Sequence, residues 1–488
     1  MTKFNSTLAT TSSKKASGIN KLTKASLLSA SALLGAGMFA SQAHADTILH
    51  AFNWKYSDIT SQAKEIAQAG YKTVLISPPL KSTGDQWWAR YQPQDIRLID
   101  SPVGNKEDLQ ALIAALKAEG VGVYADVVLN HMANESWKRS DLNYPGSELL
   151  TQYNQNADYV NRQKLFGDLS LGQFSANDFH PAGCITDWSN PGHVQYWRLC
   201  GGNGDTGLPD LDPNNWVVGQ QRLYLQALKD MGISGFRVDA VKHMSNYQIT
   251  QIFTPEITSG MHVFGEVITS GGKGSNDYHS FLEPYLNDTN HSAYDFPLFA
   301  SIRSAFSFNG SMTALHDPQA YGQALSNDRA VTFTITHDIP TNDGFRYQIM
   351  DPTDEKLAYA YILGKDGGTP LIYSDALSAN EDKDNGRWKD VWNRSDMTAM
   401  ISFHNQLQGK TMEVLYSDQC LLLFKREKQG LVAINKCGEE RSYTIDTNQF
   451  EFNWYLPYKD KLSNHSETIS SRYHTLSVPA RTARMLAL

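Results

Sequence analysis

The sequence predicts an α/β fold, and specifically a (β/α)8 TIM barrel, from three observations. Short apolar segments alternate with segments of helical periodicity from residue 46 to about residue 410. The apolar segments contain few polar positions, as expected for parallel strands that helices cover on both faces. There are seven or eight such units, which fits a closed barrel with insertions. An open, doubly wound sheet is the alternative, but no G-x-G-x-x-G motif follows the first apolar segment.

The individual elements follow from periodicity and from helix-terminating glycines. Two amphipathic segments end at Gly70 and Gly120, which are typical residues just beyond a helix C-terminus. The expected helices are residues 59–70, 105–120 and 221–232. The expected strands are residues 47–52, 72–77, 121–128, 233–240, 261–268, 330–338 and 369–374.

Two regions break this alternation and predict further domains. Residues 132–212, after the third strand, are rich in Asn, Asp, Gly and Ser, which predicts an inserted irregular domain. Residues 411–488 contain strand patterns joined by polar turns and no long helical pattern, which predicts a C-terminal antiparallel β-domain. The barrel is then formed by residues 46–131 and 213–410.

The first 45 residues have the layout of a secretory signal peptide. Lysines precede a short apolar run, and the segment ends in a small-residue cleavage pattern after Ala45. A membrane anchor is the alternative, but the run is short and interrupted by serines. The sequence contains no second long apolar run, so we expect no membrane partner after signal removal. The predicted location is secreted, either extracellular or periplasmic in transit.

Export permits disulfide bonds, and the sequence contains four cysteines in two locally spaced pairs. Four cysteines allow three connectivities, and local pairing of Cys184 with Cys200 and of Cys420 with Cys437 is the simplest. Four buried free thiols are the alternative.

The charge balance excludes some classes of partner. The net charge is −8, so we expect no nucleic-acid partner, because phosphate binding requires a basic surface. The ten Trp and 23 Tyr are compatible with a ligand that stacks on aromatic rings, although aromatic residues also fill ordinary cores. We expect a monomer.

Polar residues gather at the C-terminal ends of the predicted strands, where the active sites of (β/α)8 barrels lie. Arg237 and Asp239 are two residues apart, so they face the same side of one strand. The arginine favours the ionised form of the aspartate, which can then act as a nucleophile. The complete set comprises Asp126, Asn130, His131, Arg237, Asp239, Glu266, His337 and Asp338.

Glu266 ends the strand that follows the Arg237 strand. Adjacent strands are about 4.8 Å apart, so the carboxyl groups of Asp239 and Glu266 can lie about 5 to 5.5 Å apart, the separation for glycoside hydrolysis with retention. A negative neighbour and partial burial raise the pKa of Glu266, as a general acid requires. The pattern therefore predicts a nucleophile and an acid/base on adjacent strands.

Five segments in order resemble the signature segments of glycoside hydrolase family 13, and most nearly its secreted bacterial α-amylases. They are DVVLNH (126–131), LPDLD (208–212), GFRVDAVKH (235–243), FGEV (264–267) and TITHD (334–338). WWARYQP (87–93) resembles the loop that carries stacking aromatic residues in α-amylases.

The resemblance implies a role for each matched residue. Asp239 matches the nucleophile, Glu266 the acid/base, and Asp338 the third carboxylate, which holds sugar hydroxyl groups. Arg237 matches the arginine that orients the nucleophile. The remaining implied substrate contacts are Trp88 and Tyr91 by stacking, His131 and His337 at the cleaved bond, and Lys242 and His243 on the leaving-group side.

The resemblance also implies a structural Ca2+. Its ligands would be Asn130, Asp210, the backbone carbonyl of His243 and another carbonyl near Cys200, all oxygen donors as a hard cation requires. Chloride is not expected, because Thr336 stands where chloride-binding relatives carry Asn.

The predicted function is that of an α-amylase, a hydrolase that cleaves internal α-1,4 bonds of starch, glycogen and maltooligosaccharides with retention. A maltooligosaccharide-forming amylase or a transglycosylase of the same family is an alternative. A non-catalytic glucan-binding protein on the same barrel is a second, which the three carboxylates disfavour.

Overall fold

A computed structural model describes residues 47–202, 204–376 and 384–488. The expected signal peptide, residues 1–45, lies outside the described residues. Within the described ranges, no helix combines the length and apolar content needed to cross a membrane.

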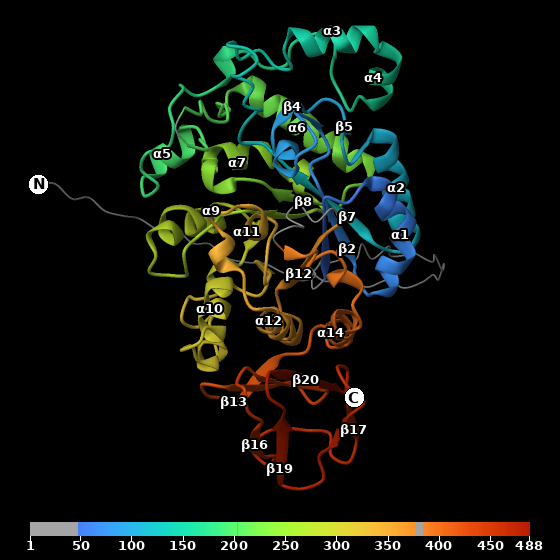
Figure 1. The fold of residues 1–488 in the computed structure, drawn as a ribbon, viewed down its shortest axis with the longest axis vertical. Helices are drawn as coiled ribbons and strands as arrows, with labels where there is room; N and C mark the ends of the chain where they lie inside the picture. Colours follow the sequence, from blue (N-terminus) through green and yellow to red (C-terminus); the bar gives the residue numbers. More distant parts are fainter. Residues whose placement is uncertain (1–46, 203, 377–383) are drawn as a thin grey trace, which may run out of the picture. The chain divides into compact units, whose positions relative to one another are not determined.

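Eight parallel strands close into a barrel, as the sequence predicts (Figure 1). Neighbouring strands pair in the order β1-β12-β11-β10-β9-β8-β7-β2. Almost every strand residue is buried, because the interior is filled by side chains and helices cover the outside. The strands are β1 Ile48–Phe52, β2 Thr73–Ile76, β7 Gly122–Val127, β8 Gly235–Val238, β9 His262–Gly265, β10 Ser292–Tyr294, β11 Ala330–Thr332 and β12 Thr369–Asp375.

The strand β10 has no counterpart among the segments expected from the sequence. It is three residues long and carries only Ala293 and Tyr294 as apolar residues, so it is too short to display a period. Its register with β9 and β11 is set by the neighbouring strands. Barrel closure therefore supplies an element that local sequence could not predict.

Helices surround the barrel, and their ends follow capping chemistry. Asn105 and Asp108 form a capping box at the start of α2, and Gly232 takes a left-handed conformation after α6. The principal barrel helices are α1 Tyr56–Gln68, α2 Lys106–Ala118, α6 Asn215–Met231, α7 Asn246–Ile252, α9 Glu283–Asp288, α10 Phe296–Phe306, α12 Pro352–Gly364 and α14 Ser395–Gln406.

Two insertions build the rim at the C-terminal ends of the strands. A small sheet in the order β4-β3-β5-β6 follows β2, and the sequence pattern did not predict it. Residues 132–212 follow β7 and contain short helices and isolated bridges, together with the disulfide Cys184–Cys200. The elements of the insertions are β3 Lys81–Ser82, β4 Pro93–Asp95, β5 Asp100–Ser101, β6 Gly104–Asn105, α3 Ser147–Gln155, α4 Ala157–Gln163 and α5 Pro191–Tyr196.

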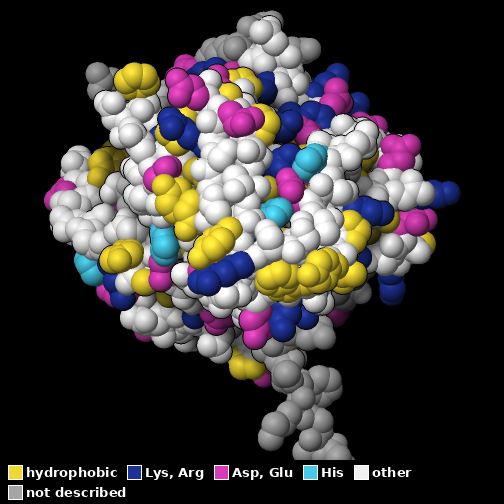
Figure 2. All heavy atoms as spheres, turned by 90° about the horizontal axis from the view of Figure 1, so that it is seen from below, with side chains coloured by type: hydrophobic (Ala, Val, Ile, Leu, Met, Phe, Trp, Pro, Cys, Tyr) yellow, Lys and Arg dark blue, Asp and Glu magenta, His cyan; other side chains and the backbone are white. Residues whose placement is uncertain are grey.

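The C-terminal region consists of antiparallel sheets, as expected. A six-stranded sheet has the order β13-β14-β15-β20-β17-β18, and β16 pairs with β19. Figure 2 looks onto this end, where charges of both signs lie among separate hydrophobic groups. The strands are β13 Met412–Ser417, β14 Leu421–Arg426, β15 Gly430–Asn435, β16 Arg441–Asp446, β17 Pro457–Asp460, β18 Ser466–Thr468, β19 Tyr473–Val478 and β20 Thr482–Ala487. The domain limits 46–131 with 213–410, 132–212 and 411–488 stay a prediction.

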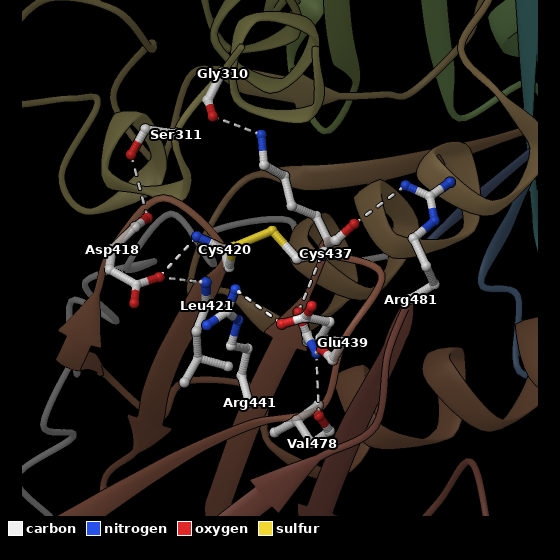
Figure 3. Close-up of a disulfide and its surroundings, with 12 residues drawn as sticks. Gly310, Ser311, Asp418, Cys420, Leu421, Cys437, Glu439, Arg441, Val478 and Arg481 are labelled. Carbon is white, nitrogen blue, oxygen red and sulfur yellow. Dashed lines mark hydrogen bonds and ion pairs between the residues drawn. A yellow bond between two sulfur atoms is a disulfide. The ribbon is translucent and has the colours of Figure 1, made fainter. Parts of the chain in front are cut away.

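The second predicted disulfide, Cys420–Cys437, lies where the C-terminal sheet meets the barrel (Figure 3). The Lys436 ammonium, next to Cys437, donates to the carbonyls of Ala305, Ser307 and Gly310 at and beyond the end of α10. Asp418, two residues before Cys420, accepts from Ser311 through its backbone carbonyl at 3.2 Å. The disulfide thus joins two segments that each contact the barrel.

Candidate active site

Arg237 lies at the centre of a cluster of carboxylates at the barrel mouth. Strand register places Asp126 of β7 opposite Arg237, and Val238 of β8 opposite Gly265 of β9, so that Asp239 and Glu266 end neighbouring strands. Arg237 Nη1 lies 2.8 Å from Asp126 Oδ1 and 2.7 Å from Asp239 Oδ1, and Nη2 lies 2.6 Å from Glu266 Oε1. One buried guanidinium therefore holds three carboxyl groups from three adjacent strands.

Glu266 has the environment of a carboxyl group that retains its proton. Burial raises its pKa to about 8; Arg237 opposes this shift, and Asp338 and Asp239 add to it. The Asp338 side chain is thus close enough to Glu266 to influence its pKa. Its Oε2 accepts from the backbone N–H of Ala240 at 3.2 Å, and Ala240 takes a left-handed backbone conformation with φ 51°. A raised pKa and a fixed position are the properties that a general acid requires.

Asp126 belongs to the same cluster, although the sequence singled it out only as a strand-end residue. It receives two hydrogen bonds from Arg237 and one, at 2.9 Å, from the hydroxyl of Tyr91. Burial raises the pKa of Asp126 to about 7, despite the opposing charge of Arg237. Asp126 holds Arg237 from the side opposite Glu266.

His337 and Asp338 follow β11 and come from the opposite side of the mouth. The His337 ring is stacked between Tyr91, at 5.1 Å, and Phe52, at 4.7 Å. Burial also raises the pKa of Asp338, with a smaller contribution from Asp239. His50 of β1, a residue that the sequence did not single out, lies edge-on to His337 at 5.4 Å.

An open cleft of about 620 Å³ lies above these groups. Trp88 is 46% exposed in it, whereas Tyr91 is 9% exposed and packs on His337, so of these two rings Trp88 is the one that is open to a ligand. The cleft also contains Trp188, which lies in the irregular insertion and was not anticipated. Its other lining residues are Trp87, Gln92, His131, Leu199, Leu208, Asp239, Ala240, Lys242, His243, Glu266, Ile268, His337, Asp338, Asn342 and Phe345.

Lys242 and His243 line the cleft beyond Glu266, but internal hydrogen bonds hold both side chains. Lys242 Nζ donates to the carbonyl of Ile268 at 2.9 Å. His243 Nδ1 donates to the carbonyl of Val194 in α5 at 3.0 Å, and its ring meets Trp188 edge-on. On the other side, His131 Nε2 donates to the carbonyl of Tyr91 at 2.9 Å. These rings and this ammonium group are fixed before any ligand binds.

Asn130 and Asp210 are neighbours below the rim. The backbone N–H of Leu211 donates to the Asn130 carbonyl at 2.9 Å, and the side chains of Asn130 and Asp210 are buried. Burial raises the pKa of Asp210 to about 6, and among the described residues its one ion-pair partner is His180, at 2.6 Å. No three His, Cys, Asp or Glu side chains gather as a metal site anywhere in the described ranges. Oxygen donors at this place therefore consist of one carboxylate, one amide and backbone carbonyls.

Comparison with known proteins identifies the family. The model "Alpha amylase, catalytic domain" matches residues 55–364. An α-amylase of Aeromonas hydrophila is 66% identical over 448 residues, which cover 91% of this chain and 96% of the relative. The chain belongs to the α-amylase family. An α-amylase of Clostridium acetobutylicum is 27% identical over 89% of this chain and 52% of its own length.

Solved structures of the family share the fold. The α-amylase I of the earthworm Eisenia fetida superposes with a TM-score of 0.71 at 21% identity, covering 91% of this chain and 97% of its own. A mutant of that enzyme, solved with maltohexaose, superposes with a TM-score of 0.69 at 22% identity over the same shares. At this identity, the likeness concerns the fold alone. The family match and the Aeromonas relative place this chain among the glycoside hydrolases.

Proposed function

We propose that the protein is a retaining α-amylase that hydrolyses internal α-1,4 bonds of starch, glycogen and maltooligosaccharides. The observation that carries this proposal is the set of three carboxyl groups, Asp239, Glu266 and Asp338, beneath an open cleft lined with aromatic residues. An open cleft suits a polymer chain that is cleaved at an internal bond. The Aeromonas relative that is 66% identical bears the name α-amylase, which supports the same activity.

The first step cleaves the glycosidic bond. Glu266, protonated because its pKa is raised, donates its proton to the oxygen of the leaving sugar. At the same time an Asp239 oxygen attacks the anomeric carbon and forms a covalent glycosyl-enzyme. The ion pair with Arg237 at 2.7 Å holds the Asp239 carboxyl group in position for this attack. Both carboxyl groups bind one guanidinium, which supports the short separation that retention requires.

The second step releases the sugar. Glu266, now ionised, removes a proton from water, whose oxygen attacks the anomeric carbon and displaces Asp239. Two inversions at the same carbon give net retention. Asp338, within hydrogen-bond reach of Glu266, would bind sugar hydroxyl groups and favour the distorted ring of the transition state. His131 and His337, fixed by Tyr91, would bind the same sugar, while Trp88 would stack on a neighbouring one.

Calcium would be held by Asn130, Asp210 and the backbone carbonyl of His243, with a further carbonyl near Cys200. The fit rests on Asp210, a buried carboxylate that no lysine or arginine within the described part of the chain pairs with. All these donors are oxygen atoms, as Ca2+ prefers. When bound, the ion would supply positive charge that ties residues 132–212 to the barrel and stabilises the cleft wall.

The two disulfides suit an oxidising compartment, which supports export of the protein. The signal peptide over residues 1–45 and a monomeric state complete the proposal.

The test is to follow maltoheptaose and amylose hydrolysis by proton NMR and to size the products over time. Retaining endo-hydrolysis gives α-anomers first and a rapid fall in polymer size. Initial β-anomers would contradict the mechanism, and products of a single size from the first minutes would indicate a maltooligosaccharide-forming enzyme instead. Products longer than the starting maltoheptaose would indicate transglycosylation.

A further inference from the structure

His50 lies at the middle of β1, fully buried, and takes no part in the reaction steps proposed above. Its side chain points to the same side of the strand as Phe52, two residues further on. Neither of its ring nitrogens has a hydrogen-bond partner within the described ranges. A buried polar atom without a partner costs free energy, and a phenylalanine would fill the same space without that cost. Packing alone therefore does not explain a histidine at this position.

Three aromatic rings surround His50, and they differ in what they can offer it. Phe52, with its ring centroid at 5.7 Å, has no polar atom. Tyr373, at 5.8 Å, donates its hydroxyl to Asp375 at 3.3 Å. His337, at 5.4 Å and nearly perpendicular, has a buried Nδ1 without a partner among the described residues. Of these three rings, His337 is therefore the one that can form a further hydrogen bond toward His50.

Both histidines are neutral at pH 7. Burial lowers the pKa of His50 well below its ordinary value, and His337 and Arg237 add to this shift. Burial also lowers the pKa of His337, Arg237 adds to the shift, and Asp239 opposes it more weakly. A neutral imidazole carries its proton on one nitrogen, and the hydrogen bond at the other nitrogen selects which one. His337 Nε2 lies 3.6 Å from Asp338 Oδ1, so Nδ1 is the nitrogen left to make that selection.

Stacking does not settle the orientation of the His337 ring. Phe52 and Tyr91 lie on its two faces at 4.7 Å and 5.1 Å and fix its plane. They do not distinguish two orientations that differ by a half-turn of the ring, nor its two tautomers, because each presents the same faces. A hydrogen bond to Nδ1 from the direction of His50 would distinguish all of them.

The spacing of the two histidines suits one water molecule between them. The rings form no direct hydrogen bond to each other. Two hydrogen bonds of about 2.9 Å through one water span roughly 4.7 Å, which nitrogens on rings with centroids 5.4 Å apart can match. Buried polar groups that lack a protein partner are typically satisfied by such waters.

We propose that His50 is a positioning residue for the reaction. Through one buried water, which accepts the N–H of His50 and donates to His337 Nδ1, it holds His337 as the tautomer with its proton on Nε2. His337 then presents Nε2–H to a hydroxyl group of the sugar at the cleaved bond. This inference rests on the proposed function, in which His337 binds that sugar.

The first test replaces His50 by Phe, which keeps a ring and removes both nitrogens, and by Gln, which keeps a donor and an acceptor. We expect kcat on maltoheptaose to fall roughly tenfold in His50→Phe with KM unchanged, because one hydrogen bond is lost from the transition state. The His50→Gln variant should stay within about threefold of the wild type. The matched control is His262→Phe, at a buried histidine of β9 that is hydrogen-bonded to Ser292 at 3.1 Å, and it should keep normal kcat per folded molecule.

A double-mutant cycle separates positioning from packing. If His50 acts through His337, adding His50→Phe to His337→Phe should lower kcat no further. Equal losses in the two backgrounds would overturn the proposal, and so would wild-type kcat in His50→Phe.

A crystal structure of the wild-type enzyme, at a resolution that shows ordered water, tests the bridge without any substitution. We expect one water within about 2.7–3.2 Å of both His337 Nδ1 and a ring nitrogen of His50. A dry gap between the rings would overturn the proposal even if the variants failed to fold. A wild type that hydrolyses no α-glucan would refute the proposed function, whereas a missing water would refute the role of His50 alone.

Discussion

Two arginines are among the largest fully buried side chains of this protein, and their surroundings differ completely. Arg237, at the mouth of the barrel, contacts the carboxyl groups of Asp126, Asp239 and Glu266. Arg426, at its base, donates to four backbone carbonyls and forms no ion pair with a carboxylate of the described residues. Those carbonyls belong to Lys410, Gly364, Lys365 and Leu407.

The contacts of Arg237 belong to a reactive site, whereas the contacts of Arg426 stabilise the fold. The carbonyls around Arg426 lie at or just beyond the C-terminal ends of α12 and α14, where the helix dipoles favour a cation. Burial lowers the pKa of Arg426 to about 10, so the arginine remains charged at neutral pH. At Arg237, burial alone would lower the pKa, but the three carboxyl groups outweigh it and raise the pKa. At Glu266, burial raises the pKa to about 8, with smaller contributions from Asp338 and Asp239, and Arg237 only partly offsets this shift.

The largest expected effect comes from replacing the carboxyl groups at the barrel mouth. Glu266→Gln, Asp239→Asn and Asp338→Asn should each lower kcat on amylose by about a thousandfold or more, because the three groups act as one unit. Circular dichroism should show a native fold in each variant. Glu283→Gln, which removes a partly exposed acid that does not line the cleft, is the matched control and should keep normal kcat. A Glu266→Gln enzyme with near-normal turnover would refute the assignment.

Arg426→Met tests whether the contacts of Arg426 stabilise the fold. This substitution keeps apolar volume but removes four hydrogen bonds to backbone carbonyls, three of them buried, so we expect the free energy of unfolding to fall by about 3 kcal/mol. Chemical denaturation measures this loss, with the exposed Lys428→Met as control. Specific activity per folded molecule should stay normal. If Arg426→Met instead lost activity while keeping its stability, the contrast between the two arginines would be wrong.

Calcium removal tests a third buried charge, the carboxylate of Asp210. A chelator should lower the melting temperature, because an ion bound only by the folded state stabilises it by about 2.7 kcal/mol at one hundred times its dissociation constant. Asp210→Asn protein should melt at the same temperature with and without the chelator. Equal melting of calcium-loaded and chelator-treated wild type would argue against the site.

Stability as a function of pH sharpens the view of the reactive cluster. A carboxyl group whose pKa is raised on folding, as at Glu266, keeps its proton in the folded state while the unfolded state has released it. Stability is therefore lost as pH rises from the ordinary glutamate value of 4.5 to about 8. The Glu266→Gln variant has no carboxyl group at this position and so avoids this loss. Between pH 5 and pH 8 its free energy of unfolding should therefore rise by about 1 kcal/mol or more relative to that of the wild type.

Thermal melts of both proteins at several pH values measure this difference. Parallel curves for wild type and Glu266→Gln would mean that folding does not raise the Glu266 pKa. Glu283→Gln serves again as the control and should follow the wild type.

The same two regions show what could be predicted from sequence. Arg237, Asp239, Glu266 and Asp338 could be placed because strand parity and the barrel rule both depend on local pattern. The partnership of Asp126 with Arg237 depends on register between β7 and β8, which local sequence does not encode. The contacts of Arg426 could not be predicted from the sequence, because its partners are backbone carbonyls from helices that only the fold brings together.

The rim was less predictable than the strand ends. Trp188 lies in residues 132–212, a segment without periodicity, where packing rather than pattern decides which side chains face the cleft. The resemblance to glycoside hydrolase family 13 assigned roles to Trp88 and Tyr91, but it could not distinguish the exposed ring from the buried one. Chain-specific aromatic residues in the insertion therefore required the structure.

The smallest expected effect concerns chloride, which we predict this enzyme does not need. Both terminal nitrogens of Arg237 already contact carboxyl groups, so an added anion there would meet Asp126, Asp239 and Glu266 at close range. Thr336 offers only a hydroxyl group, and the other nearby cation in sequence, Arg346, is paired with Asp384 at 2.6 Å. A buried chloride with so few donors would not recover its hydration energy.

To test the chloride prediction, the enzyme is dialysed into acetate buffer, and chloride is titrated while amylose hydrolysis is measured across pH. Potassium acetate holds the ionic strength constant, because added salt alone screens charges. We expect less than a twofold change at any pH. A severalfold rise in rate, or an upward shift of the alkaline limb, would show that an anion does bind beside Arg237 despite the three carboxyl groups.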